Sequence, residues 1–96
     1  MARPQRLEAE TIEAALREID AWQVKGGRLH REFVFADFKA AFDFMTRVSV
    51  VAEELDHHPD WSNVYNRVRV DLYTHDVGGL TELDLKLARA MNRIAG

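Results

Sequence analysis

The spacing of apolar residues predicts three helices along the chain. Steps of three and four predict helices from Glu8 to about Asp20, from Asp37 to just before Pro59, and from Thr81 onward. Asp37 and Thr81 can each cap a helix, because their side chains accept hydrogen bonds from first-turn amides. The longest apolar stripe lies in the middle helix and has seven members: Phe38, Ala41, Phe42, Met45, Val48, Ala52 and Leu55. This stripe predicts the best-defined helix of the chain.

Four segments between the helices have the pattern of strands. Residues 22–24 and 28–35 flank Gly26-Gly27, and glycines suit a hairpin turn because they tolerate positive φ. Residues 63–65 and 67–75 form a second pair, and the longer one alternates apolar and polar positions. The predicted order is α-β-β-α-β-β-α. We therefore expect an α+β fold in which helices pack on one face of a four-stranded antiparallel sheet.

The composition fits a single domain that spans residues 1–96, with residues 1–7 expected as a loose arm. Hydrophobic residues make up 47% and charged residues 30%, as is ordinary for a globular protein. The formal net charge is −3 and no basic run occurs, so nucleic acid is not expected as a partner. No apolar run is long enough for a membrane span, and the N-terminus has no signal-peptide core. We expect a soluble, cytoplasmic protein.

Three of the four histidines fall where predicted elements end. His57 and His58 stand at the end of the middle helix, which Pro59 limits because proline disfavours helical geometry in the preceding residue. His75 ends the longest strand, whereas His30 lies inside a strand and is expected at the surface or at a sheet edge. Helix and strand ends that meet at a loop-rich edge commonly form a concave site. Imidazoles transfer protons well near neutral pH, so the cluster predicts acid–base chemistry.

A structural role and a metal site are the competing interpretations of this cluster. Single histidines and acids near a helix end often do no more than solvate it. The chain has no cysteine, and neighbouring helical residues diverge by about 100°, so His57 and His58 do not easily chelate one ion. The i, i+4 spacing of helical metal ligands is also absent. Proton transfer is favoured, with Glu53, one turn before His57, expected to orient its ring.

The order of these residues resembles the signature of the pterin-4a-carbinolamine dehydratases. That signature is an acid, three residues, His-His-Pro, an aromatic residue, a later histidine and an aspartate. Its positions are filled here, at the family's spacing, by Glu53, His57-His58-Pro59, Tyr65, His75 and Asp84. The segments DHHPDWSNVYNRV and FDFMTRV are also similar to the family, and the resemblance spans Trp22 to about Ile94.

The resemblance implies an enzyme that removes water from 4a-hydroxytetrahydropterin and gives quinonoid dihydropterin, in tetrahydrobiopterin recycling. It implies catalytic roles for His57, His58 and His75. Substrate-binding roles are implied for Glu53, Asp56, Trp61, Thr74 and Asp84. It implies no metal and no organic cofactor. The implied partners are the pterin, further copies of the chain in a homodimer or homotetramer, and a functional link to an aromatic amino acid hydroxylase.

Two other classes of function stay open. One is a non-catalytic module that binds a partner protein, like the dimerisation cofactor and coactivator role of animal family members. Ser62, Val77 and Leu83 depart from the pattern of those animal members, which weakens this alternative. The other is a small metal-binding protein, which would retain stoichiometric metal when purified without chelators.

Overall fold

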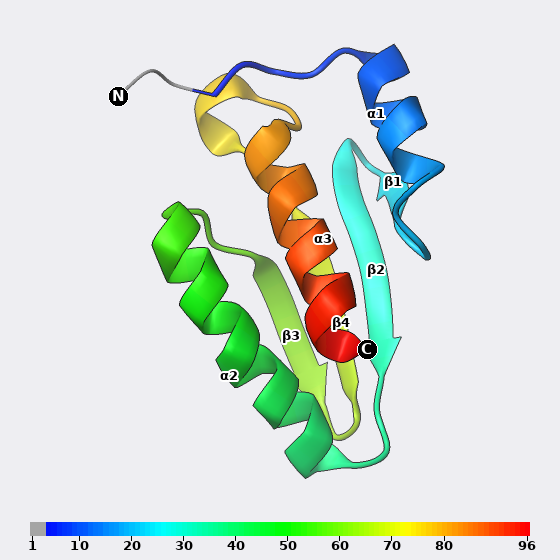
Figure 1. Ribbon diagram of the computed structural model, residues 1–96, viewed down its shortest axis with the longest axis vertical. Helices are drawn as coiled ribbons and strands as arrows, with labels where there is room; N and C mark the ends of the chain where they lie inside the picture. The colour runs from blue at the N-terminus through cyan, green and yellow to red at the C-terminus, as the bar shows by residue number, and fades with distance from the viewer. Residues whose placement is uncertain (1–3) are drawn as a thin grey trace.

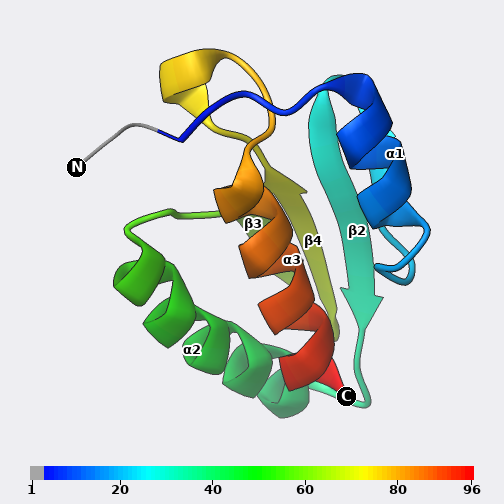
Figure 2. The same ribbon diagram turned by 45° about the horizontal axis from the view of Figure 1, so that its top comes forward.

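The computed structural model describes residues 4–96, which form three α-helices, four strands and one 3-10 turn. In chain order these are α1 (Ala9–Leu16), β1 (Gln23–Lys25), β2 (Arg28–Val34), α2 (Phe38–Leu55), β3 (Asp60–Val64), β4 (Arg67–Leu72), η1 (His75–Val77) and α3 (Glu82–Ala95). The strands are antiparallel and lie in the order β1-β2-β4-β3. Helices α2 and α3 cover the same face of the sheet (Figures 1 and 2). The predicted α+β fold and element order are confirmed.

One face of the sheet is buried because its strands alternate apolar and polar side chains. Val68, Val70 and Leu72 of β4 are fully buried. Leu29 and Phe33 of β2 lie opposite Leu72 and Val68 in the register. The helices complete this core with Ala41, Phe44 and Val48 from α2 and with Leu85, Leu87, Ala88 and Met91 from α3. Burying one such large side chain stabilises a fold by about 1.5–3 kcal/mol, so the shared core holds both helices against the sheet.

The buried face of α2 differs from the predicted stripe. Its buried residues are Ala41, Phe44, Val48 and Ala52. Phe38 and Phe42, which the stripe includes, are 49% and 52% exposed, whereas Phe44, which it omits, is buried. The apolar stripe and the buried face differ at these positions because aromatic residues occur on two sides of the helix. Spacing alone does not tell which side faces the sheet.

Both predicted helix caps are confirmed. The Asp37 carboxylate accepts a hydrogen bond from the Ala40 amide at 2.8 Å. At the start of α3, the Thr81 hydroxyl accepts from the Leu83 amide, and Asp84 accepts from the Thr81 amide in a capping box. Helix α1 is shorter than predicted and ends at Leu16. The chain then bends through residues 17–21.

The second hairpin also differs in its bounds from the prediction. Strand β3 begins at Asp60 rather than Asn63, and Tyr65, at φ 50°, forms the turn into β4. Strand β4 ends at Leu72, because Thr74 pairs with Gly79 in an isolated bridge that closes a loop. His75 is therefore the first residue of the short turn η1. The prediction that His75 ends a strand was wrong.

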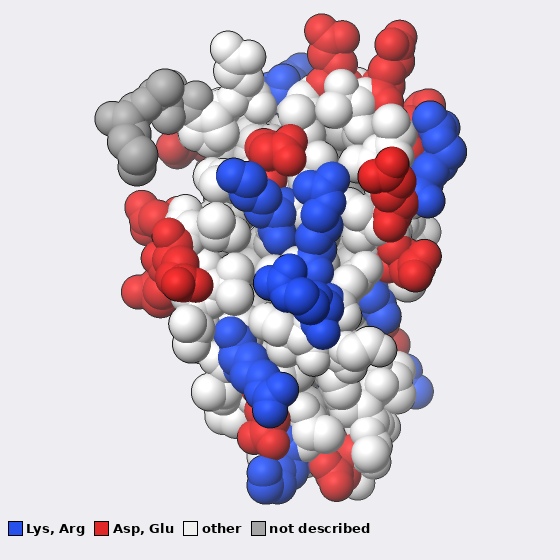
Figure 3. All heavy atoms as spheres, in the orientation of Figure 1, with Lys and Arg blue, Asp and Glu red and all other residues white. Residues whose placement is uncertain are grey.

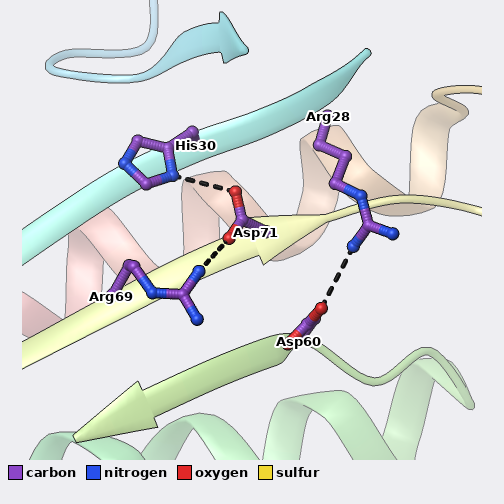
Figure 4. Close-up of polar contacts among 5 residues, drawn as sticks. All are labelled: Arg28, His30, Asp60, Arg69 and Asp71. Carbon is purple, nitrogen blue, oxygen red and sulfur yellow. Dashed lines mark hydrogen bonds and ion pairs between the residues drawn. The ribbon is translucent and has the colours of Figure 1, made fainter. Parts of the chain in front are cut away.

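The other face of the sheet is polar and open. On it, His30 Nδ1 lies 2.8 Å from Asp71 Oδ1, and Arg69 contacts the second oxygen of the same carboxylate (Figure 4). His30 belongs to β2, an interior strand of the sheet, so it lies on the open face and not at an edge.

The helix-bearing face carries charges of both signs. Basic side chains gather over α3 in the middle of this face, and acidic ones lie beside the end of α2 and over α1 (Figure 3). The basic residues of α3 are Lys86, Arg89 and Arg93. Within residues 4–96, no helix combines the length and the apolar character needed to cross a membrane.

Candidate active site

The end of α2 is a hydrogen-bonded turn that sets the backbone of His57. The helix ends at Leu55, and Asp56 adopts the left-handed conformation (φ 50°, ψ 44°). The amide of Asp56 donates to the carbonyl of Glu53 at 3.2 Å, and the amide of His57 donates to the carbonyl of Ala52 at 3.0 Å. These two bonds form a Schellman motif, in which aspartate tolerates the left-handed position better than most residues. His57 thus leaves the helix slightly earlier than Pro59 alone would require.

The side chain of His57 is held by a buried polar network at the start of α3. His57 Nε2 lies 2.6 Å from Asp84 Oδ1, and the two side chains are 10% and 0% exposed. The other oxygen, Oδ2, accepts from the Thr81 amide at 2.9 Å and from the Thr74 hydroxyl at 2.8 Å. The Thr74 and Thr81 hydroxyl oxygens are 2.9 Å apart. Such networks hold their members rigidly when every group is paired.

The donors and acceptors of this network assign its hydrogens. A carboxylate only accepts, so His57 donates to Asp84 from Nε2, and the other ring nitrogen, Nδ1, carries the free lone pair when the ring is neutral. The single hydroxyl hydrogen of Thr74 goes to Asp84. The hydroxyl of Thr81 therefore donates to Thr74, while its oxygen accepts from the Leu83 amide at 3.2 Å. Each of these groups has a partner, and one tautomer of His57 is selected.

His58 contacts Glu53, whereas its neighbour His57 contacts Asp84. Nε2 of His58 lies 2.5 Å from Glu53 Oε2, and the two side chains are 57% and 77% exposed. The expectation that Glu53 orients His57 is wrong, because the left-handed Asp56 turns His57 away and leaves His58 beside Glu53. Exposed pairs of this kind are weak, typically worth about 0–1 kcal/mol.

His75 is an exposed residue of the loop that the Thr74–Gly79 bridge closes. Among the described residues, no side-chain hydrogen bond to its imidazole is found. Its ring instead lies edge-to-face with the ring of Tyr73, with centroids 5.1 Å apart and an interplanar angle of 80°. His57 and His75 are thus supported by entirely different contacts.

The three histidines predicted to be catalytic line one cavity. Its volume is about 700 Å³, and its lining comes mainly from the end of α2, from η1 and from the start of α3. These three segments lie near one another at the same end of the molecule (Figure 1). The cavity is lined by Pro4, Leu55, Asp56, His57, His58, Tyr73, Thr74, His75, Asp76, Glu82, Leu83 and Lys86. Among the other predicted site residues, Asp56 and Thr74 line it, whereas Glu53, Trp61 and Asp84 do not. Glu53 and Asp84 contact histidines of the cavity, and Trp61 packs against the hydrophobic core.

Several residues of this region were not singled out from the sequence as site residues. Tyr73, Glu82 and Lys86 line the cavity, and Thr81 belongs to the network behind His57. The sequence contains one indication for Tyr73, which is an aromatic residue at a position where the alternation of its strand is otherwise polar. Thr81 gave none, because its role as a helix cap explained it completely.

The described part of the N-terminal arm contacts the His75 loop. The amide of Leu7 donates to the carbonyl of Leu80 at 2.8 Å, and Arg6 donates to the carbonyl of Gly78 at 3.4 Å. A Cβ atom on Gly79 would lie only 2.5 Å from Cδ of Arg6, so the arm packs closely on this glycine. Pro4 adds to the wall of the cavity. Residues 1–3 of the predicted arm lie outside the described part of the chain.

The polar groups around the cavity suit proton transfer to a bound small molecule. Two imidazoles have carboxylate partners, and the third lies in the same cavity. Among residues 4–96, no three His, Asp or Glu side chains are grouped closely enough to hold a metal ion.

Comparison with known proteins identifies the family. The family model described as pterin 4 alpha carbinolamine dehydratase matches residues 5–94. The chain belongs to this family. A Chelativorans protein that carries the provisional name pterin-4-alpha-carbinolamine dehydratase is 55% identical over 97 residues, which cover 99% of this chain and 98% of the relative. A Brucella ovis protein with the same provisional name is 54% identical over the full length of both chains.

Two solved structures resemble this member of the dehydratase family. A transcriptional coactivator/pterin dehydratase from Brucella melitensis has a TM-score of 0.92 and 52% identity, over 96% of this chain and all of the other. A pterin dehydratase-like protein that is a RuBisCO assembly factor in the alpha-carboxysome has a TM-score of 0.64 and 22% identity. It matches 78% of this chain and 87% of its own, and this likeness shows the fold alone.

Proposed function

We propose that this chain is an active 4a-hydroxytetrahydropterin dehydratase that uses histidine acid–base catalysis. The observation that carries the proposal is the meeting of His57, His58 and His75 at one cavity, in a member of the dehydratase family. A cavity of about 700 Å³ is within the range that holds small organic ligands. The reaction as proposed uses no metal and no organic cofactor.

The chemistry requires one proton donor and one proton acceptor. The lone pair on pterin N5 expels the 4a-hydroxyl group as the C4a–O bond breaks, and the departing oxygen takes a proton to become water. The resulting cation then loses a proton and becomes the neutral quinonoid dihydropterin. One proton enters and one leaves, so the enzyme returns to its starting state. Each positioned acid or base typically contributes about 10²–10⁴-fold to the rate.

We assign one of the two proton-transfer roles to His57. Asp84 holds Nε2–H of the ring, so Nδ1 is the atom that exchanges a proton with the substrate. In this respect the pair works as the His–Asp pair of a catalytic triad does.

We assign the second proton-transfer role to His75 and a binding role to His58. His75 is exposed at the cavity, so its ring nitrogens can reach the substrate and then exchange protons with water. His58 is paired with the exposed Glu53, which supports a role in gripping and orienting the pterin.

The remaining site residues have supporting roles in the proposal. Asp56 and Thr74 line the cavity and contact the substrate. Glu53 and Asp84 act through the histidines that they contact. For Trp61 we propose that packing against the core keeps β3, and with it the segment after His58, in place.

The dehydration rate tests this function directly. The 4a-hydroxytetrahydropterin would be generated in place by a hydroxylase, and its decay would be followed by absorbance at pH 7–8. The wild type is compared with a double variant, His57→Ala with His75→Ala, whose fold is checked by circular dichroism. We expect fast turnover by the wild type and none above buffer by a folded double variant. A wild type no faster than buffer would refute the dehydratase proposal.

A protein-binding module is the second candidate function. The Brucella melitensis relative is named as both a coactivator and a dehydratase. Helix α2 also exposes Phe38, Phe42 and Val50, at 49%, 52% and 59%, which is the kind of surface that protein partners bind. A module would keep its partner binding in the histidine double variant, whereas Phe42→Ser would weaken it and leave dehydration intact.

The cellular setting is also part of the proposal. We infer a cytoplasmic enzyme that recycles pterin for an aromatic amino acid hydroxylase and acts as a homodimer or homotetramer. The exposed apolar residues of α2 support self-association. Sedimentation equilibrium over a range of protein concentrations measures the assembly, and a monomer at every concentration would contradict this part.

A further inference from the structure

The proposed chemistry does not explain how the side chain of His75 is held in place. A proton-transfer group must be held at a defined place, yet His75 is exposed and lies on a three-residue turn. The Tyr73 ring, edge-to-face at 5.1 Å, is the aromatic neighbour of its imidazole. Edge-to-face pairs prefer this geometry because the positive edge of one ring meets the negative face of the other.

The Tyr73 ring is in turn covered by an arginine from a neighbouring strand. Leu29 pairs with Leu72, so Arg28 and Tyr73 occupy the next position on β2 and on the extension of β4. The guanidinium carbon of Arg28 lies 5.1 Å from the centroid of the Tyr73 ring. A cation within about 6 Å of an aromatic centroid is attracted to the ring face.

Arg28 is itself anchored on the far side of β4. Its Nη1 lies 3.1 Å from Asp60 Oδ2, at the start of β3, and the two side chains are 34% and 64% exposed. Figure 4 shows Arg28 reaching from β2 toward Asp60 across the end of β4. Asp60 follows His57, His58 and Pro59 in the chain, so this ion pair lies next to the segment that carries two of the cavity histidines.

We propose that Tyr73 is a positioning residue for His75, and that Arg28, anchored by Asp60, keeps Tyr73 in place. This inference rests on the proposed dehydratase function. Tyr73 acts through His75, because its ring restricts the imidazole to orientations that face the cavity. Arg28 is needed as a planar cation, so lysine does not replace it fully. Misplacing a catalytic group by about 1 Å can cost 10²-fold in rate.

The test separates the ring of Tyr73 from its hydroxyl group. Tyr73→Phe keeps the ring, and Tyr73→Leu removes it. We expect kcat for dehydration to fall by about 10–10²-fold in Tyr73→Leu with a smaller change in KM, and to be largely kept in Tyr73→Phe. Arg28→Met should lower kcat less than Tyr73→Leu does. The matched control is Arg67→Gln, which removes an arginine paired with Glu32 elsewhere on the open face.

A second readout does not depend on catalysis. The ring protons of His75 experience the ring current of Tyr73, so their NMR shifts should move in Tyr73→Leu and stay in place in Tyr73→Phe. Unchanged kcat and unchanged His75 resonances in a folded Tyr73→Leu variant would overturn the inference. If Tyr73→Leu does not fold, Arg28→Met decides by the same two readouts. If the wild type is inactive but the His75 resonances respond as expected, the dehydratase function is refuted. The packing of Tyr73 against His75 is then still supported.

Discussion

His57 and His75 lie in one cavity, yet the protein holds them in opposite ways. His57 is buried and bonded to Asp84, which is fixed by Thr74 and Thr81. His75 is exposed on a short turn, beside the ring of Tyr73. Hydrogen bonds fix the tautomer of the first ring, whereas packing restricts only the orientation of the second. The difference suits the two roles that we propose, in which His57 presents a defined atom to the substrate and His75 exchanges protons with water.

The largest expected effect comes from removing the charge of Asp84. Asp84→Asn keeps the shape but places an amide where three donors converge, so at least one of them loses its acceptor. We expect kcat to fall by about 10²–10⁴-fold and the free energy of unfolding by about 1–3 kcal/mol. Steady-state kinetics and urea unfolding measure the two. Asp43→Asn, an exposed carboxylate on α2, is the control and should change neither quantity.

Replacing His57 or His75 alone should have different effects on stability. His57→Ala leaves the Asp84 carboxylate buried without this donor, so we expect a loss of about 1–3 kcal/mol in unfolding free energy. His75→Ala removes an exposed side chain and should stay within about 0.5 kcal/mol of the wild type. Both should lose most of their activity. Urea unfolding measures the stability of both variants. Equal unfolding free energies would contradict the conclusion that His57, unlike His75, is held by a buried hydrogen-bond network.

Removing the Thr81 hydroxyl should have a moderate effect. Thr81→Val loses both the helix cap and the hydrogen bond to Thr74, and should cost about 0.5–2 kcal/mol in unfolding free energy. Thr81→Ser keeps the hydroxyl and should recover most of that loss. Because the network fixes His57, kcat should fall in Thr81→Val but not in Thr81→Ser. Thermal unfolding and the dehydration rate are measured in parallel on the two variants. If Thr81→Val changes the stability but not kcat, the Thr81 hydroxyl has a purely structural role.

The smallest effect is expected for the exposed Glu53–His58 pair. Glu53→Gln removes the charge but keeps the size, and should change the unfolding free energy by less than about 1 kcal/mol. Its effect should fall on KM rather than on kcat, because His58 is proposed to bind the pterin. A loss of kcat as large as that of Asp84→Asn would mean that His58 also transfers a proton.

Features set by neighbouring residues could be predicted from the sequence. The element order follows from apolar spacing and glycine turns, and the caps at Asp37 and Thr81 involve partners within three residues. The three histidines were selected because predicted elements end at them and because they match the signature of the family, and the fold brings them to one cavity.

Contacts between distant residues could not be predicted in the same way. Helical spacing pointed to Glu53 as the partner of His57, but the left-handed Asp56 redirects the chain. The real partner, Asp84, lies 27 residues away and reaches His57 only through the packing of α3 beside α2. The contacts from Arg28 to Tyr73 and from Tyr73 to His75 depend on strand register and on the bend after Leu72.

The proposed proton-transfer roles of His57 and His75 can be tested by comparing the dehydration rate of the wild type with the rates of the single variants His57→Ala and His75→Ala. All three would be assayed with freshly generated 4a-hydroxytetrahydropterin at pH 7–8, after each fold is checked by circular dichroism. We predict rapid dehydration by the wild type and a loss of about 10²-fold or more in each folded variant. A wild type no faster than buffer, or a variant as fast as the wild type, would contradict it.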